Sequence, residues 1–327
     1  LKIDSEGNVT LPAALQRSLK TYYDNGWHLI GIPEHLGGFG GPPTVAMAAF
    51  ELAAGANPAA TFYHLGSINA GILDGLATEA QKEIYCANAI ERRWGGTMVL
   101  TEPDAGSDVG AARSVARHLH DDVWEIEGTK RFITNGDYDG VENIVHLVLA
   151  RPEGAGAGTK GLSTFIVPKF WPNPDGSPGE RNGVHCSNIE KKMGIKASAT
   201  CEMVFGTRGI PARGLLVGDK HEGIRQMFKV IEYARMAVGI KSYSTLSTAY
   251  LNALAYCKER VQGADLKLAA DKNAPRVAVI AHPDVRRMLM AQKAHAEGLR
   301  ALSMFTASIQ DQVELLGGHG AVEAKKL

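Results

Sequence analysis

The feature that most constrains the fold is a change in the spacing of apolar residues along the chain. Residues 11–95 are Ala-rich with a helical texture, residues 97–207 alternate as strands do, and helical spacing returns from Asp219. No helical stretch separates the short apolar runs of the middle block, so a parallel nucleotide-binding sheet is not expected. We therefore predict an α+β fold with an N-terminal helical domain (1–96), an antiparallel β-domain (97–216) and a C-terminal helical domain (217–327).

The middle block contains several short strand patterns. Trp124–Glu127 alternates, Gly128 is a turn residue, and Lys130–Thr134 continues the pattern, which predicts a hairpin that turns at Gly128. Further strands are predicted from the apolar runs Ile144–Ala150, Leu162–Val167 and Glu202–Phe205.

Helix signals flank this block on both sides. Thr78 and Gln81 form a capping-box pattern, which predicts a helix start at Glu79. After the block, apolar residues at helical spacing predict a long helix to about Glu259, with one apolar stripe. The stripe comprises Ile224, Met227, Phe228, Ile231, Ala234 and Val238. Pro283 suits the first position of a second long helix.

Composition excludes several classes of function. Of the 327 residues, 45% are hydrophobic and 21% charged, and Lys plus Arg equals Asp plus Glu at 35 each, which argues against a nucleic-acid partner. The four cysteines are scattered without metal spacing, so we expect no metal site and a cytoplasmic location. No apolar run has membrane-spanning length, so no membrane association is expected. The sequence begins with Leu1 and ends without a helix stop signal, so we expect an incomplete C-terminal domain.

The glycine cluster Gly37–Gly41 is interpreted as a plain loop. No strand pattern precedes it, Pro42 and Pro43 follow it, and its spacing does not match a dinucleotide-binding motif.

Three segments together carry a family resemblance. Leu100–Asp108 reads LTEPDAGSD, Glu127–Gly136 reads EGTKRFITNG, and Glu190–Ser198 reads EKKMGIKAS. In this order they resemble the flavin-binding segments of the acyl-CoA dehydrogenases, and the resemblance extends over essentially the whole chain. Ala274–Ala301 is similar to the longer branch that includes 3-methylmercaptopropionyl-CoA and broad-range fatty acyl-CoA dehydrogenases.

The resemblance implies an FAD site. Leu100 and Thr101 would contact the pyrimidine end of the flavin ring, and Gly106 and Ser107 would lie near the FAD phosphates and the CoA arm. On the other side of the ring the resemblance places Phe132, Ile133 and Thr134, with Thr134 near N5. Many members carry Trp where this chain has Phe132.

Arg260, with Gln262, matches the arginine that reaches the FAD diphosphate of a neighbouring subunit. This match implies a homodimer or homotetramer.

The resemblance also implies substrate contacts by Ser107, Glu232 and Arg235. From spacing alone, Glu232 and Arg235 could instead form a simple ion pair within the helix. No catalytic residue is assigned, because the family's Tyr-Glu-Gly-Thr motif does not occur and Ala234 holds the position of the carboxylate in a few members. The Leu315–Gly320 string, LLGGHG, is interpreted as a loop between helices.

The function implied is dehydrogenation of a fatty acyl-CoA to the trans-2-enoyl-CoA, as in fatty-acid β-oxidation, with electrons passed to an electron-transfer flavoprotein. A non-catalytic or regulatory flavin-binding homologue is the alternative. An oxidase that uses O₂ is a third possibility, which depends on solvent access to the flavin.

Overall fold

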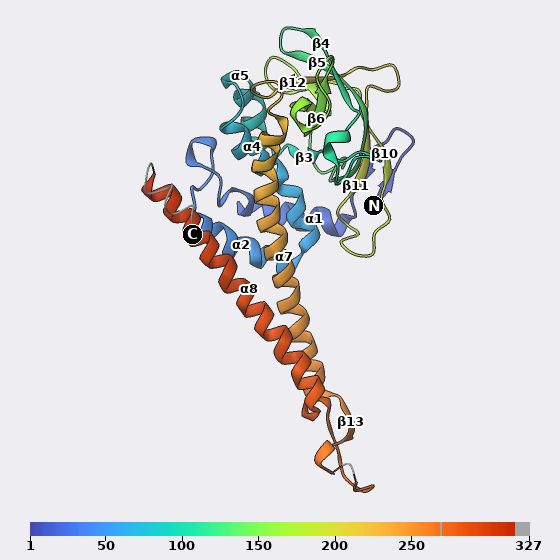
Figure 1. Ribbon diagram of the computed structural model, residues 1–327, viewed down its shortest axis with the longest axis vertical. Coiled ribbons are helices and arrows are strands. Elements are labelled where there is room, and N and C mark those ends of the chain that lie inside the picture. Colours follow the sequence, from blue (N-terminus) through green and yellow to red (C-terminus); the bar gives the residue numbers. More distant parts are fainter. Residues whose placement is uncertain (269, 318–327) are drawn as a thin grey trace. The chain divides into compact units, whose positions relative to one another are not determined.

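The computed structural model describes residues 1–268 and 270–317 of the chain. They fall into two compact units (Figure 1). The first comprises Leu1–Gly41 and Pro58–Ala234, and the second comprises Pro42–Asn57 and the chain from Arg235 onward.

The secondary structure follows the predicted order of helices, strands and helices. The strands of the first unit are β1 (Lys2–Ile3), β2 (Val9–Thr10), β3 (Gly95–Val99), β4 (Val115–His120), β5 (Val123–Thr134), β6 (Ile144–Pro152), β7 (Ser163–Pro168), β8 (Phe170–Pro172), β9 (Pro178–Arg181), β10 (Val184–Ile189), β11 (Thr200–Phe205) and β12 (Ala212–Leu216). Its helices are α1 (Ala13–Asp24), α3 (Pro58–Thr61), α4 (Leu65–Asp74), α5 (Glu79–Gln81) and α6 (Ala87–Glu91). The second unit contains α2 (Pro43–Ala56), β13 (Val261–Ala264), β14 (Arg276–Ala278) and α8 (Pro283–Leu316), and α7 (Gly223–Glu259) belongs to both units.

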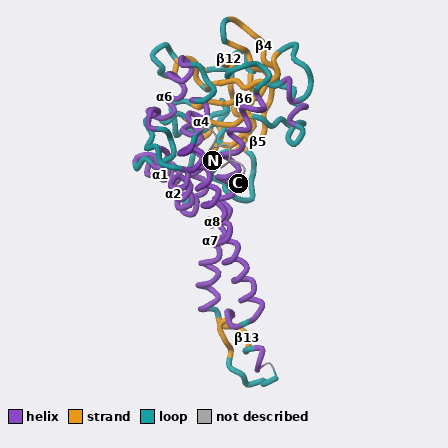
Figure 2. Tube along the Cα trace, turned by 60° about the vertical axis from the view of Figure 1, so that its left-hand side comes forward, coloured by secondary structure: helices purple, strands orange, loops and turns teal. Residues whose placement is uncertain are grey.

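Strand pairing in the first unit closes on itself. β5 pairs with β12, β12 with β7, β7 with β6, β6 with β4, and β4 with β5 again, so these five strands form a closed ring. β11 and β10 extend the sheet from β5, and β3 extends it from β6. The strands appear in orange in Figure 2. The predicted β-domain is confirmed, but the sheet is mixed, because β6 pairs in parallel with both β3 and β4.

The apolar residues of the alternating strands fill the interior of this ring. Trp124 and Ile126 of β5 are buried together with Val148 of β6 and Phe165 of β7. Burial of one face at every second residue explains why the sequence pattern predicted strands here.

The predicted hairpin at Gly128 is wrong. β5 runs without a turn from Val123 to Thr134, and Gly128 lies inside it with a φ of 153°. A β-carbon at this position would approach Ser114 Oγ to 2.2 Å. The glycine is therefore required by the close approach of Ser114, which directly precedes β4, and not by a turn.

Helix predictions in the first unit are confirmed. Thr78 caps the helix that begins at Glu79, and the side chain of Gln81 bonds back to the Thr78 amide, which completes the capping box. The helix continues through a π turn, Lys82–Cys86, into α6. Gly37–Gly41 forms a loop, as predicted.

The second unit is a group of helices joined by polar contacts. Asp311 of α8 accepts hydrogen bonds from the backbone and side chain of Thr44 at the start of α2, and Arg300 of α8 pairs with Glu51 of α2. Pro283 is the first residue of α8, as predicted. α8 ends at Leu316, and Gly318–Gly320 of the LLGGHG string lie outside the described residues.

The predicted apolar stripe on α7 is buried only in part. Met227 is fully buried, whereas Phe228 and Val238 are 45% and 47% exposed. Among the described residues no helix is both long and apolar enough to cross a membrane.

Gly128 provides a test of the strand assignment. Gly128→Ala should lower the free energy of unfolding by about 1–3 kcal/mol, because the added methyl group would overlap Ser114. Denaturant unfolding measures this difference. Gly156→Ala is the matched control, since a β-carbon there meets no atom within 4 Å and should change stability by under about 0.5 kcal/mol. Equal effects of the two substitutions would contradict the assignment.

Buried histidines should make the chain sensitive to acid. Burial lowers the pKa of His28 and His64 to about 4 and that of His146 to about 3. Below the ordinary histidine pKa of about 6.5, the unfolded chain binds protons that the folded chain excludes. Stability should therefore fall as pH decreases from about 6.5 to about 4.

His146→Gln should make this pH dependence shallower by about one proton, as measured by unfolding at a series of pH values. His295→Gln is the control, because His295 is exposed on α8. An unchanged slope in the His146 variant would contradict the explanation.

Candidate functional site

The structure brings two of the three motif segments into direct contact. Leu100 and Thr101 follow the end of β3, and Lys130 and Arg131 lie near the end of β5. Lys130 Nζ donates to the Leu100 carbonyl at 3.0 Å, and the Arg131 amide donates to the Thr101 carbonyl at 2.8 Å. The two segments predicted to lie on opposite sides of a flavin ring are thus fixed to each other by hydrogen bonds.

A buried ion pair holds the two motif segments together at this contact, which we call the junction. Lys130 is 0% exposed, and its ammonium group lies 2.8 Å from Glu102 Oε1. It also donates to the Leu149 carbonyl at 2.7 Å. Glu102 accepts further bonds from the amides of Arg113 (2.7 Å) and Ser114 (3.0 Å). Every donor direction of the ammonium group therefore has an acceptor, which is the condition for burying a charge.

Ionisation of the pair follows from these contacts. Burial by itself raises the pKa of Glu102, but Lys130, Ser114 and the Arg113 amide together lower it by more, so the pKa lies below its ordinary value. Burial lowers the pKa of Lys130, and Glu102 opposes that shift. Because Glu102 is held as a carboxylate, we assign the pair as ionised near neutral pH.

Sequence reasoning did not single out Lys130 or Glu102. Both lie inside the motif segments, at the Lys of EGTKRFITNG and the Glu of LTEPDAGSD. The sequence offered one signal for this pair. Each motif contains a charged residue, and one of these two residues, Lys130, lies on a strand that alternates between buried and exposed positions.

A β-bulge shapes the end of β5. Opposite Glu202 of β11 the register shifts, so that Arg131 and Phe132 face one residue. Phe132 has a φ of 60° and is 57% exposed, which is unusual for a bulky residue. Such strain is often found at ligand sites, and the bulge here directs an aromatic ring outward.

The third motif segment is tied to the same bulge. Arg131 Nε donates to Glu190 at 2.9 Å, and its guanidinium lies 5.0 Å from the centre of the Phe132 ring. Farther along the strand, Ile133 is buried opposite Cys201, and Thr134 is half-buried opposite Thr200. The three motif segments therefore meet at this end of β5.

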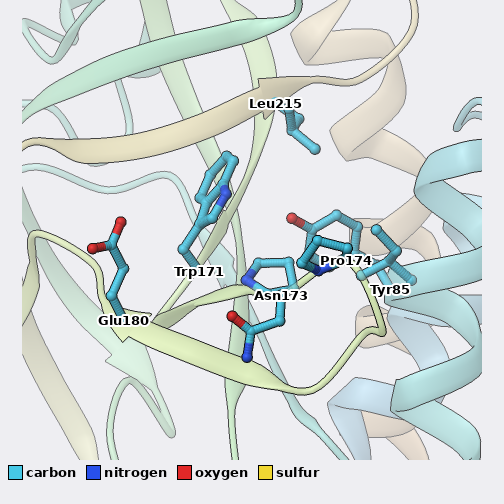
Figure 3. Close-up of a pocket in the computed structure, with 8 residues that line it drawn as sticks. Tyr85, Trp171, Asn173, Pro174, Glu180 and Leu215 are labelled. Atoms are coloured by element: carbon cyan, nitrogen blue, oxygen red, sulfur yellow. The ribbon is translucent and has the colours of Figure 1, made fainter.

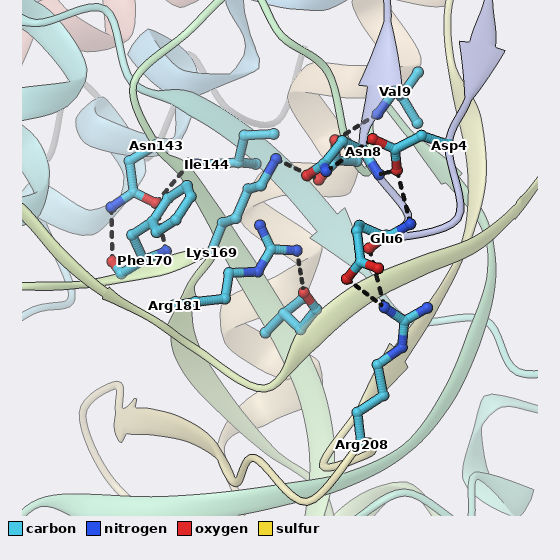
Figure 4. Close-up of polar contacts among 12 residues, drawn as sticks. Asp4, Glu6, Asn8, Val9, Asn143, Ile144, Lys169, Phe170, Arg181 and Arg208 are labelled. Carbon is cyan, nitrogen blue, oxygen red and sulfur yellow. Dashed lines mark hydrogen bonds and ion pairs between the residues drawn. The ribbon is translucent and has the colours of Figure 1, made fainter.

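The turn that follows β5 is anchored by buried polar contacts. Asp137 accepts from the Val9 amide at 3.0 Å and pairs with Lys169 at 2.7 Å. Lys169 and Val9 are shown in Figure 4. These contacts fix the chain just beyond Thr134.

Gly106 and Ser107 lie on the exposed loop after Thr101. The fold itself does not demand glycine at position 106, because the nearest neighbour of an added β-carbon would be Thr101 Cγ2 at 3.6 Å. The missing side chain leaves open space beside Thr101, which suits close approach of a bound group to the backbone. The residues of this region therefore fit the FAD site that the resemblance implies.

The remaining predicted site residues lie elsewhere. Arg260 follows the last turn of α7, and Gln262 lies in β13, so both belong to the second unit. Both are exposed, and their contact with a neighbouring subunit stays a prediction. Glu232 and Arg235 are exposed on α7, and neither forms an ion pair with any described residue. The simple ion pair within the helix is therefore not formed.

Within the described residues there is no cluster of three or more His, Cys, Asp or Glu side chains that could hold a metal ion.

Removal of Lys130 tests the role of the ion pair. Lys130→Met should destabilise the chain by about 3–5 kcal/mol, because Glu102 would remain buried without its partner. Lys130→Met combined with Glu102→Gln should recover part of this loss, and Lys160→Met, at an exposed lysine, should cost little. A loss below about 1 kcal/mol in urea unfolding would show that the pair does not hold the junction.

Comparison with known proteins supports the same assignment. Residues 2–92 match the family model for the acyl-CoA dehydrogenase N-terminal domain, and residues 97–207 match the model for the acyl-CoA dehydrogenase middle domain. A broad-specificity linear acyl-CoA dehydrogenase, FadE5, of Mycobacterium tuberculosis is 58% identical over 97% of this chain and 52% of its own length. The 3-methylmercaptopropionyl-CoA dehydrogenase of Ruegeria pomeroyi is 39% identical over 98% of this chain and 53% of its own length.

The chain thus spans about half the length of these curated relatives. Among solved structures, an acyl-CoA dehydrogenase from Bacillus anthracis complexed with FAD has a TM-score of 0.73 at 22% identity, covering 95% of this chain and 48% of its own. That likeness shows a shared fold. From the two family models and the identity to these relatives, we conclude that the chain belongs to the acyl-CoA dehydrogenase family.

Proposed function

We propose that this chain forms the flavin- and thioester-binding part of an FAD-dependent dehydrogenase, which converts a straight-chain fatty acyl-CoA to the trans-2-enoyl-CoA. The observation that carries the proposal is the direct bonding of the Leu100–Thr101 and Phe132–Thr134 segments through Lys130 and Arg131. The identity to a relative described as a linear acyl-CoA dehydrogenase supports the substrate class.

FAD, when bound, supplies the acceptor for the hydride that leaves the β-carbon of the thioester. The roles of the chain are to bind and orient. Thr101 and Thr134 each offer a hydroxyl to the ring, and Leu100 and Ile133 offer backbone groups. The exposed ring of Phe132 provides an apolar wall beside the flavin, and Gly106 and Ser107 approach the phosphate and CoA portions.

Fewer residues of the chain are candidates for contact with the acyl-CoA. Ser107, Glu232 and Arg235 are the candidate contacts for the acyl-CoA. Removal of an α-proton needs a carboxylate within hydrogen-bond reach of that carbon, and Ala234 cannot supply one. We therefore assign no catalytic base to the residues of this chain.

The assembly and partners are part of the same proposal. Arg260 and Gln262 contact the FAD diphosphate of a second subunit, which makes the enzyme a homodimer or homotetramer. An electron-transfer flavoprotein accepts the electrons. A cytoplasmic location, expected from the scattered cysteines, stays a prediction.

Flavin binding gives the direct test. Titration of the chain with FAD should show saturable binding, and Thr134→Ala and Ser107→Ala should each weaken it by about 2- to 10-fold, since each removes one hydrogen bond. Ser5→Ala, on an exposed N-terminal turn, should leave the affinity unchanged. Equal affinity in all three variants would contradict the site.

A test of catalysis distinguishes the proposed dehydrogenase from the alternative, a non-catalytic homologue. A form extended to the length of the relatives should lose its flavin absorbance when mixed anaerobically with a saturated straight-chain acyl-CoA. The 327-residue chain should bind FAD without this bleaching, because it lacks the base. Persistent flavin absorbance in the extended form would favour the non-catalytic alternative.

A further inference from the structure

The outer face of the sheet at the end of β5 carries one of the proposed flavin contacts, Thr134. Ile133 of β5 pairs with Cys201 of β11, and both are buried in the core of the sheet. Successive side chains of a strand point to opposite faces, so Thr134 and its partner Thr200 lie together on the outer face. Paired side chains are about 5 Å apart. A charge held beside Thr200 is therefore also close to Thr134.

A lysine of the third motif segment supplies such a charge. Lys192 Nζ donates to the Thr200 hydroxyl oxygen at 2.8 Å and to the Ser198 carbonyl at 2.8 Å. Lys192 is half-buried, as are Thr200 and Thr134. The two hydrogen bonds hold the ammonium group on the outer face, at the end of β5 where the three motif segments meet.

This ammonium group differs from the other cations of the site because it is not neutralised. Lys130 is paired with Glu102. Arg131 is paired with Glu190. By contrast, no carboxylate oxygen of the described residues lies within 4.0 Å of Lys192 Nζ. Burial lowers the pKa of Lys192, because its charge is partly removed from water. A negative charge that arises beside Lys192 would therefore be stabilised.

The proposed reaction creates a negative charge on the flavin. Hydride transfer from the substrate β-carbon carries two electrons and one proton to the flavin, which adds one unit of negative charge to the ring. A nearby ammonium group therefore favours the reduced flavin over the oxidised flavin. Tighter binding of the reduced form raises the reduction potential of the bound flavin.

A hollow of about 520 Å³ beside Trp171 lies at the opposite end of β5 (Figure 3). Leu215 in its wall pairs with Val123, the first residue of β5, whereas Thr134 is the last. The length of this strand corresponds to roughly 35 Å. Electrostatic interactions across water are largely screened beyond about 8 Å at physiological salt. A flavin bound in that hollow would therefore not respond to the charge of Lys192.

We propose that the Lys192 ammonium group stabilises the reduced form of the bound flavin through its charge and so sets the reduction potential of the site. This inference rests on the FAD site of the proposed function. Thr200 and Ser198 position the ammonium group, and its effect acts through space without a direct bond to the ring.

Two measurements on the 327-residue chain test this role. Fluorescence titration gives the affinity for oxidised FAD, and anaerobic reduction with xanthine and xanthine oxidase against a reference dye gives the two-electron midpoint potential. Lys192→Gln retains a donor for the Ser198 carbonyl but removes the charge. It should leave the affinity for oxidised FAD within about twofold and weaken binding of reduced FAD by about tenfold. This change corresponds to a midpoint potential lower by about 30 mV. Lys192→Met should lower the potential equally.

Two further variants serve as controls. Lys192→Arg keeps the charge, and Lys191→Gln removes an exposed charge of the same loop. Both should keep the ratio of the two affinities within about twofold of the wild-type ratio, and circular dichroism verifies the fold of each variant. An unchanged potential in Lys192→Gln and Lys192→Met, or an equal loss of affinity for both forms of FAD, would overturn the proposal. Absence of FAD binding by the wild-type chain would overturn the proposed function together with this inference.

Discussion

The arrangement of the candidate site depends on the buried Lys130–Glu102 ion pair. One ammonium group holds the Glu102 carboxylate together with the carbonyls of Leu100 and Leu149, so it joins the chain after β3 to β5 and β6. Burial of such a pair costs desolvation free energy that an apolar contact would not, even though all hydrogen bonds of the ammonium group are made here. We infer that the pair is retained despite this cost because it fixes two segments at one geometry. An apolar contact would leave the two segments free to slide.

The same junction explains why the end of β5 departs from regular strand geometry. The Arg131 amide bonds to Thr101 across the junction, and the bulge that follows places Phe132 on the surface at positive φ. An isolated strand would relax this strain, but Arg131 is also held by Glu190 of the third segment. Because Arg131 is bonded both to Thr101 and to Glu190, the Phe132 ring stays exposed where the proposed flavin would cover it.

Much of the fold was predictable from the local sequence pattern. The alternation or the helical spacing of apolar residues indicates directly which faces of the strands and helices are buried. The capping box at Thr78 and the proline at position 283 marked helix starts correctly. The role of Gly128 was predicted wrongly. A glycine that is needed to prevent a clash with a neighbouring segment looks, in the sequence, like a glycine at a turn. The Lys130–Glu102 pair joins residues 28 positions apart, and no local pattern encodes such a contact. The site residues themselves came from the motif resemblance and not from spacing.

A crystal structure of the chain with FAD would show where the flavin ring lies relative to the Lys130–Glu102 pair. We expect the isoalloxazine ring between Thr101 and Thr134, with both hydroxyls within about 3.2 Å of ring atoms. We also expect the Lys130–Glu102 contact to stay as it is in the free chain. A flavin ring bound away from both threonines, or an ion pair that opens when FAD binds, would contradict this assignment of the site.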